Sequence, residues 1–244
     1  ALGRKPMLLS FHPQAAYAIG AEYDGVHLSV GLVDLAGRVS SIRKAEAPPD
    51  LGLLLGSLLE SEVEALIATS GLARERIKGL GLGVPAVVHE GEGLIGLAPL
   101  VGVERTVDYK PLISKLEARL GMPIKVANDA NAAALGEVAA RGEDCGGDLI
   151  FVVLGRGVGA GLILDGRLRQ GSSASAGEIG YMVFDRLARG TSPGPGWLES
   201  SMGLSAFWAE VARQGSPDQA SVERVASFLA LGLANLCIAL DVRT

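Results

Sequence analysis

The 244-residue sequence predicts an α/β fold, and three observations indicate it. Hydrophobic residues make up 48% of the chain, and 34 glycines suit a compact protein with many tight connections. Short runs of apolar and β-branched residues, of strand length, alternate with stretches whose apolar residues recur at helical spacing. Each half of the chain also opens with two strand-like runs joined by a turn. The length is ample for a hydrophobic core.

Charge and cysteine content exclude several classes of function. The net charge of −5 offers no basic patch for nucleic acid, which binds through clustered Lys and Arg. Cys145 and Cys237 are too few for a disulfide framework, and we find no signal peptide. No uninterrupted apolar run is long enough to span a membrane. We therefore expect a cytoplasmic protein without a membrane partner.

The first half predicts a sheet followed by helices. Strands are expected over 17–23 and 26–34, joined by a turn at Asp24-Gly25, with a third strand around 39–42. Asp50 is a candidate N-cap for the next helix. The apolar face of that helix is expected at Leu55, Leu59, Val63 and Leu66.

Two further strand and helix pairs follow. A buried strand is expected over 78–84, and a helix starting at Pro111 should face inward through Leu112, Leu116 and Leu120 before Gly121 ends it. A strand over 124–127 leads to Asn128-Asp129 and a helix over 130–142. Asn128 and Asp129 have two interpretations, as a simple helix cap or as ligand-binding groups at the end of a strand.

The stretch over 148–182 organises the second half. A strand over 149–154 is followed by alternating glycines and a second apolar run over 162–164, and Asp165-Gly166 is a turn. A dinucleotide fingerprint requires a helix after the glycines, and here a strand follows. The alternatives are a plain hairpin or a hairpin whose glycines allow a ligand close to the backbone. Glu178 lies among small residues, where a ligand could reach it.

Two helices close the chain, over 204–212 and 221–240, and Trp197 and Trp208 are expected in the core. The inward face of the last helix is expected at Val225, Leu229, Leu233, Leu236 and Leu240. The charged, glycine-rich segment near 142–148 is a candidate boundary. We therefore expect a connector over 1–14, an N-terminal lobe over 15–130 and a C-terminal lobe over 131–244.

Three ordered segments resemble one family. Its phosphate loop and Gly-Glu-x-Gly segment resemble LGRGVGAGLILDGRLRQGSSASAGEIGYM, and its Asn-Asp segment resembles VANDANAAALGE. The connector of its repressors is similar to GRKPMLLSFHPQAAYAIGAEY. The family is ROK, which comprises repressors, uncharacterised reading frames and sugar kinases. The resemblance implies an actin-like ATPase (ribonuclease H-like) fold, with two α/β lobes around a cleft. It also implies an upstream DNA-binding winged helix-turn-helix domain, absent from this chain.

The resemblance implies a sugar site and argues against phosphate transfer. It assigns ligand binding to Asn128, Asp129, Glu178, Tyr181 and Glu199, with Asp129 matching the general base of the kinases, and it assigns a phosphate-loop-like turn to Gly155, Gly157 and Gly159. The kinases carry Asp, two glycines and Thr at the first hairpin. Here Glu22, Asp24, Gly25 and Val26 stand there, so a hydroxyl is lost and a carboxylate would repel a triphosphate. We expect no catalytic residue and no cofactor.

A structural zinc is also not expected. The family's zinc ligands, one His and three Cys, match Tyr181, Gly190, Ser192 and Trp197, none of which is a thiolate or an imidazole. His12, His27 and His89 have no chelating spacing. Ala86 stands where the family has Gly, and Leu100 where relatives have a sugar-contacting Asn.

The favoured function is the sugar-sensing domain of a transcriptional regulator of the xylose-repressor branch. It would bind a sugar effector in the interlobe cleft, reach operator DNA through the missing domain, and form a homodimer or higher homo-oligomer. The alternatives are an ATP-dependent sugar kinase and a degenerate dimerisation domain without ligand. Because relatives continue past the position of Thr244, we expect the chain to be truncated.

Overall fold

The computed structural model describes residues 10, 12–96, 98, 101–142, 147–185 and 196–242, and most of the expected connector lies outside them. The chain forms two compact units, Ala1–Leu82 with Pro111–Lys125, and Gly83–Lys110 with Val126–Thr244. The sequence analysis placed a single boundary between residues 130 and 131. In the structure the chain instead crosses between units three times, and residues 83–110 group with the second unit.

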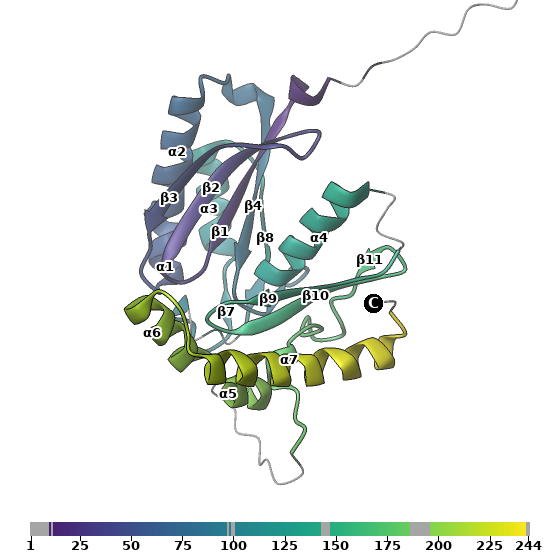
Figure 1. Cartoon of the computed structure of the whole chain (residues 1–244). Coiled ribbons are helices and arrows are strands. Elements are labelled where there is room, and N and C mark those ends of the chain that lie inside the picture. The colour runs from purple at the N-terminus through teal and green to yellow at the C-terminus, as the bar shows by residue number, and fades with distance from the viewer. Residues whose placement is uncertain are drawn as a thin grey trace, which may run out of the picture. The chain divides into compact units, whose positions relative to one another are not determined.

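A five-stranded sheet in the order β3-β2-β1-β4-β8 forms the centre of the first unit (Figure 1). Its strands are β1 (Tyr17–Tyr23), β2 (His27–Asp34), β3 (Val39–Glu46), β4 (Ile77–Val84) and β8 (Ile124–Asn128). β2 pairs antiparallel with both β1 and β3, and Gly25, with a φ of 84°, makes the predicted turn. Side chains alternate across a strand, so Ile19, Ala21 and Tyr23 of β1 point into the core.

The helices of the first unit follow the predicted pattern with one correction. They are α1 (Leu51–Leu53), the π-helical turn η2 (Leu54–Leu58), α2 (Leu59–Ser70) and α3 (Lys110–Leu120), with the 3-10 turns η1 (Pro13–Ala15) and η3 (Arg74–Arg76). Oδ1 of Asp50 accepts the Leu53 N–H at 2.9 Å, as expected of an N-cap. The predicted face at Leu55, Leu59, Val63 and Leu66 is buried. In α3, Ile113 is buried and Leu112 only half-buried, because the inward stripe runs through positions 113, 116 and 120.

A three-stranded antiparallel sheet, β11-β10-β9, is the scaffold of the second unit. It consists of β9 (Leu149–Leu154), β10 (Val158–Leu164) and β11 (Arg167–Leu168). The predicted hairpin is confirmed, with Leu154 opposite Val158, so the second strand begins within the glycine alternation rather than at Leu162. The prediction of a buried first strand was wrong, because β9 lies at the sheet edge and is half-buried throughout.

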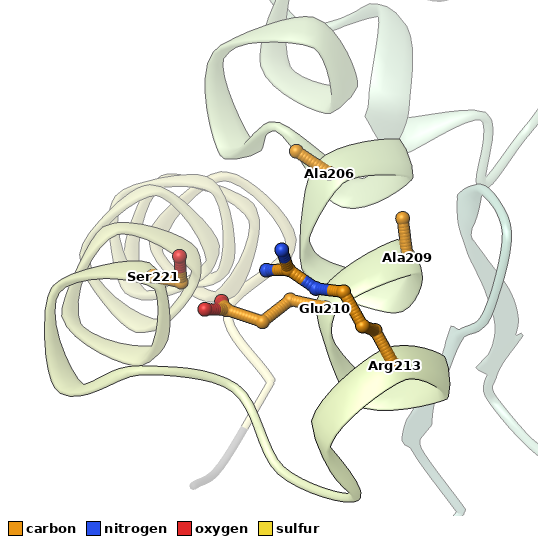
Figure 2. Close-up of a pocket in the computed structure, with 5 residues that line it drawn as sticks. All are labelled: Ala206, Ala209, Glu210, Arg213 and Ser221. Atoms are coloured by element: carbon orange, nitrogen blue, oxygen red, sulfur yellow. The ribbon is translucent and has the colours of Figure 1, made fainter.

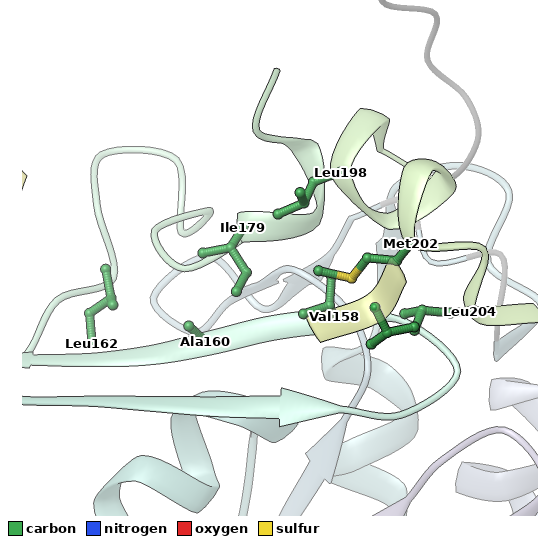
Figure 3. Packing of buried hydrophobic residues seen from close by; sticks show 8 residues of the cluster. Val158, Ala160, Leu162, Ile179, Leu198, Met202 and Leu204 are labelled. Atoms are coloured by element: carbon green, nitrogen blue, oxygen red, sulfur yellow. The ribbon is translucent and has the colours of Figure 1, made fainter. Parts of the chain in front are cut away.

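Helices cover both faces of this sheet (Figure 1). α4 (Asp129–Arg141) packs on β9 and β10, and a Cβ on Gly161 would lie 2.4 Å from the Ala130 carbonyl oxygen. The glycines of β10 therefore let the backbone of α4 approach the strand closely. On the other face, the side chains of Val158, Ala160 and Leu162 project from β10 on the side where Ile179 and Leu198 lie (Figure 3). That face is covered by η6 (Ile179–Tyr181), α5 (Trp197–Met202), α6 (Leu204–Gln214) and α7 (Gln219–Leu240).

α7 is long and apolar enough, by length and composition alone, to cross a membrane. The sequence analysis expected no such segment, but Ser227, Gly232 and Asn235 interrupt the apolar run without adding a charge. Val225 is buried in the apolar cluster of this unit, and Leu229, Leu236 and Leu240 pack against that cluster, but only 11% of the apolar window of α7 is buried. Three short strands complete this unit as a sheet in the order β5-β6-β7. They are β5 (Val88–His89), β6 (Leu94–Ile95) and β7 (Val107–Asp108).

Candidate functional site

Asn128 and Asp129 lie where β8 ends and α4 begins, as predicted. Oδ1 of Asn128 accepts the Asn131 N–H at 3.0 Å, and its Nδ2 donates to the Ala86 carbonyl at 3.1 Å. Asn128 is therefore a helix cap, and both ends of its amide are engaged within the protein. Asp129 follows in the first turn, where its Oδ1 accepts the Ala130 N–H at 2.8 Å.

Glu178 lies in the loop before η6, and its position is determined by Gly177. The φ of Gly177 is +93°, and a Cβ there would lie 1.8 Å from the Ala160 carbonyl oxygen. Only glycine permits this backbone approach, and the Gly177 carbonyl accepts the Ala160 N–H at 2.8 Å. The loop that carries Glu178 is thus fixed directly onto β10.

Glu178 is half-buried and lies near two other carboxylates. Burial raises the pKa of its carboxyl above the ordinary value, and the negative charges of Asp129 and then Glu199 raise it further. These carboxylates come from three separate segments, the start of α4, the loop before η6 and the start of α5. The structure therefore brings Asp129 and Glu199 each within electrostatic reach of Glu178.

Glu199 belongs to the first turn of α5 and reaches back to the β9–β10 hairpin. Its Oε2 accepts the Val158 N–H at 3.2 Å, and a Cβ on Gly157 would lie 2.9 Å from the same oxygen. Burial raises the pKa of the Glu199 carboxyl, and the hydrogen bond from Val158 partly offsets that rise. Gly157 thus leaves room for a carboxylate of the protein itself.

Tyr181 ends η6 and is 49% exposed. Burial raises the pKa of its hydroxyl, and the charges of Glu178 and Glu199 add to the effect. The phenol therefore lies beside the carboxylates, with half of its surface turned to solvent. Together these groups offer several hydrogen-bond acceptors, one hydroxyl and one flat apolar face, a combination suited to a polyhydroxylated ligand.

The predicted phosphate-loop-like glycines form the tip of the hairpin. The Gly155 N–H donates to the Gly157 carbonyl at 2.9 Å, which closes the turn, and the Val158 N–H is used by Glu199. A Cβ on Gly159 would be in ordinary contact with Ala130, so that glycine faces α4. The Gly155 and Val158 amides are therefore already engaged within the protein.

The turn between β1 and β2, where the sequence analysis expected phosphate binding to be lost, has its amides occupied by a side chain of the same turn. Oδ1 of Asp24 accepts the Val26 N–H at 2.7 Å and the His27 N–H at 2.6 Å. Nδ1 of His27 lies 3.3 Å from Oδ2 of the same carboxylate. The turn amides that an anion would need therefore already bind a carboxylate.

No group of three or more His, Cys, Asp or Glu within the described ranges could hold a metal ion. Of the four positions matched to zinc ligands, Gly190 and Ser192 lie outside those ranges, as does Leu100. Trp197 packs edge-on against Phe184 at 6.0 Å and Phe228 at 5.8 Å, so it belongs to the core as predicted.

Sequence reasoning missed the roles of two residues. Trp208 was expected in the core, but it is 37% exposed and its indole N–H donates to the Gly155 carbonyl at the hairpin tip. Asn131 is 6% exposed, and within the described structure its Oδ1 is buried without a hydrogen-bond partner. Neither feature has a signal in a single sequence, because the Trp208 hydrogen bond joins distant segments and the burial of Asn131 depends on the folded chain.

A hollow between α6 and α7 lies apart from these residues (Figure 2). Its lining consists of Ala206, Ala209, Glu210, Arg213 and Ser221. Glu210 already accepts the Asp218 N–H at 3.2 Å through its Oε2. None of the predicted site residues contributes to this hollow.

Comparisons with known proteins show the family of this chain. The model of the ROK family matches residues 18–243. The chain is 30% identical over 188 residues to a putative xylose repressor of Caldicellulosiruptor sp. (strain Rt8B.4), which covers 75% of this chain and 45% of the repressor. It is 31% identical over 221 residues to a glucokinase of Streptomyces coelicolor, which covers 88% of this chain and 64% of the kinase. The chain thus spans about half to two thirds of the length of these relatives.

A solved structure confirms the fold. The ROK family glucokinase from Streptomyces griseus, in complex with glucose and AMPPNP, superposes with a TM-score of 0.69 at 26% identity, covering 93% of this chain and 80% of that one. The predicted actin-like α/β fold is therefore correct. Repressor and kinase match at nearly the same identity, so similarity alone does not decide between the two branches.

Proposed function

Because this chain belongs to the ROK family, we propose that it is the sugar-sensing domain of a transcriptional regulator. The observation that carries the proposal is the turn between β1 and β2, where the Asp24 carboxylate occupies the amides of Val26 and His27. A nucleotide phosphate would have to displace that carboxylate and overcome its charge. Val26 also lacks the hydroxyl that the resembling kinases have at this turn.

The sugar-binding part of the proposal rests on the second unit. Asp129, Glu178, Glu199 and Tyr181 are coupled electrostatically, and charge-assisted hydrogen bonds to hydroxyls are roughly twice as strong as neutral ones. Tyr181 is 49% exposed, and its ring would offer an apolar face to a sugar. Asn128 contributes by holding the start of α4, since both ends of its amide are engaged.

Sugar binding would regulate DNA binding through thermodynamic linkage between the two sites. A sugar that binds one conformation of the sensor more tightly biases the attached DNA-binding domain, with a coupling energy of about 1–3 kcal/mol. Operator DNA and a homodimeric assembly are part of the same proposal. Operator binding suits the relatives named as xylose repressors.

A sugar kinase is the second candidate. It is supported by the glucokinase similarity and by the match of Asp129 to the general base of the kinases. In that case Asp129 would take the proton from the sugar hydroxyl that attacks ATP.

One pair of experiments separates these functions. A thermal-shift panel of glucose, xylose and N-acetylated hexosamines should identify a stabilising sugar, since a ligand at 100 times its Kd adds about 2.7 kcal/mol. Glu178→Gln should abolish that shift, whereas Glu104→Gln, at an exposed glutamate of the same unit, should retain it. A coupled ATP assay should show no turnover with the same sugars. Turnover that disappears in Asp129→Asn would establish the kinase, and a panel without any shift would leave the degenerate dimerisation domain.

A further inference from the structure

The tip of the β9–β10 hairpin is held from two sides. On one side, the indole N–H of Trp208 donates to the Gly155 carbonyl. On the other, Oε2 of Glu199 accepts the Val158 N–H at 3.2 Å. Between these two contacts, the Gly155 N–H closes the turn onto the Gly157 carbonyl at 2.9 Å.

Both holding side chains come from one continuous stretch of the chain. Glu199 lies on α5 and Trp208 on α6, and Gly203, with a φ of 69°, joins the two helices directly. Leu204, the first residue of α6, and Val158 of the hairpin are both buried in one apolar cluster (Figure 3). The start of α6 is therefore anchored in the same apolar cluster as the strand whose tip Trp208 contacts.

Because Trp208 is partly exposed, we expect its hydrogen bond, rather than the packing of its ring, to hold the turn. The ring is 37% exposed and touches Phe207 edge-on at 5.2 Å. An indole has a single N–H donor, and Trp208 uses it on the turn. Trp197, the other tryptophan of the chain, packs among aromatic rings instead, which makes it a matched control.

We propose that Trp208 is a positioning residue of the ligand site, which holds the Gly155–Gly157 turn so that the Val158 N–H meets the carboxylate of Glu199. The proposal gives each carboxylate oxygen of Glu199 its own function. Oε2 is fixed by the hairpin, and Oε1 has no hydrogen bond within the described residues and is left to accept a ligand hydroxyl. The ligand part of the proposal rests on the proposed sugar-binding function.

The first arm of the test needs no ligand. In Trp208→Phe, which keeps a ring and removes the donor, amide exchange at Val158 should become about two- to tenfold faster, the range expected for one weakened hydrogen bond. Exchange at Ala160, whose N–H bonds to the Gly177 carbonyl, should stay unchanged and report an intact fold. Trp197→Phe should leave the Val158 amide as protected as in the wild type.

A carboxyl titration gives a second readout that a purely structural contact would not change. The Val158 hydrogen bond lowers the pKa of Glu199 against the effect of burial, so losing it should move the Glu199 carboxyl resonance to titrate at higher pH. Glu178 and Tyr181 face the same carboxylate, and their titrations should be recorded alongside. Unchanged exchange at Val158 and unchanged titration of Glu199 in Trp208→Phe would overturn the proposal.

The second arm measures affinity for glucose and xylose by titration calorimetry. We expect Trp208→Phe to weaken the sugar that binds the wild type by about two- to tenfold, with Trp197→Phe unaffected. An unchanged affinity despite faster Val158 exchange would refute the positioning role. If neither sugar nor any member of the wider panel binds the wild type, the proposed function fails, and the ligand-free readouts still decide whether Trp208 positions Glu199.

Discussion

Nδ1 of His27 lies 3.3 Å from Oδ2 of Asp24, across the turn that joins β1 to β2. The other oxygen of that carboxylate accepts two backbone N–H groups of the same turn. The Asp24 carboxylate therefore closes the turn in which it lies. This contact gives the chain its clearest difference from a phosphate-binding loop, and it leads directly to a measurable dependence of stability on pH.

Asp24→Asn should destabilise the protein at neutral pH by about 0.5–1 kcal/mol, because an amide oxygen is a weaker acceptor than a carboxylate. Burial raises the pKa of Asp24, but the hydrogen bonds from His27 and Val26 outweigh it, so the folded pKa lies below 3.8. The stabilisation is therefore present above pH 3.8 and is lost as the pH falls through the folded pKa. Urea melts of both proteins over this range should converge at acid pH, and a constant difference would contradict the argument.

Local sequence signals predicted most of the first unit. Turn residues such as Asp24-Gly25, the N-cap Asp50 and the face at Leu55, Leu59, Val63 and Leu66 act over a few residues, so a single sequence contains them. The inward face of α3 was displaced by one position, because helical spacing fits a stripe through Leu112 nearly as well as one through Ile113.

The site was predictable only as a set of residue types. The sequence contains Asp129, Glu178 and Glu199, but the effect of the other two carboxylates on Glu178 depends on close backbone approaches at Gly177 and Gly157. The hydrogen bond from Trp208 to Gly155 joins residues 53 positions apart. No local pattern marks such a contact, and an exposed tryptophan therefore looks like a core residue in the sequence.

Gly177→Ala should prevent the second unit from folding. The new Cβ would lie 1.8 Å from the Ala160 carbonyl oxygen at a φ of +93°, so both sterics and backbone strain oppose it. Gly136→Ala is the matched control, since Gly136 lies within α4 with nothing inside 4 Å of the added Cβ. That control should gain about 0.5–1 kcal/mol. Circular dichroism melts compare the two, and a well-folded Gly177→Ala protein would show that the loop lies elsewhere.

Asn128→Ala should cost about 1–2 kcal/mol, because it removes the cap on Asn131 and the donor to Ala86. Asn128→Ser should recover roughly half of that loss, since a serine hydroxyl can still cap the helix. Urea denaturation measures both values. Equal stability of the Ala and Ser variants would mean that the cap contributes nothing measurable, and that Asn128 stands here for another reason.

Zinc should be absent from the purified protein, and a chelator should leave its Tm unchanged. The positions matched to zinc ligands are Tyr181, Gly190, Ser192 and Trp197, which supply no thiolate or imidazole. Elemental analysis after dialysis checks the expectation. A one-to-one zinc content would show that the residues between Tyr181 and Glu199 have been matched wrongly to the family pattern.

Glu178→Gln should raise the Tm of the ligand-free protein at neutral pH. Burial, followed by the charges of Asp129 and Glu199, raises the folded pKa of Glu178 above 4.5, so the ionised carboxylate costs stability above that folded pKa. As the pH falls from neutral toward 4.5, the wild type becomes protonated in the folded state first, and the gap between the two proteins should close. The same substitution should lower affinity for any sugar that binds, because glutamine lacks the charge that strengthens hydrogen bonds to hydroxyls. Thermal melts across this pH range, with and without sugar, test the predicted stability and the predicted affinity. A variant less stable than the wild type at neutral pH would mean that Glu178 stabilises the fold instead of serving a ligand.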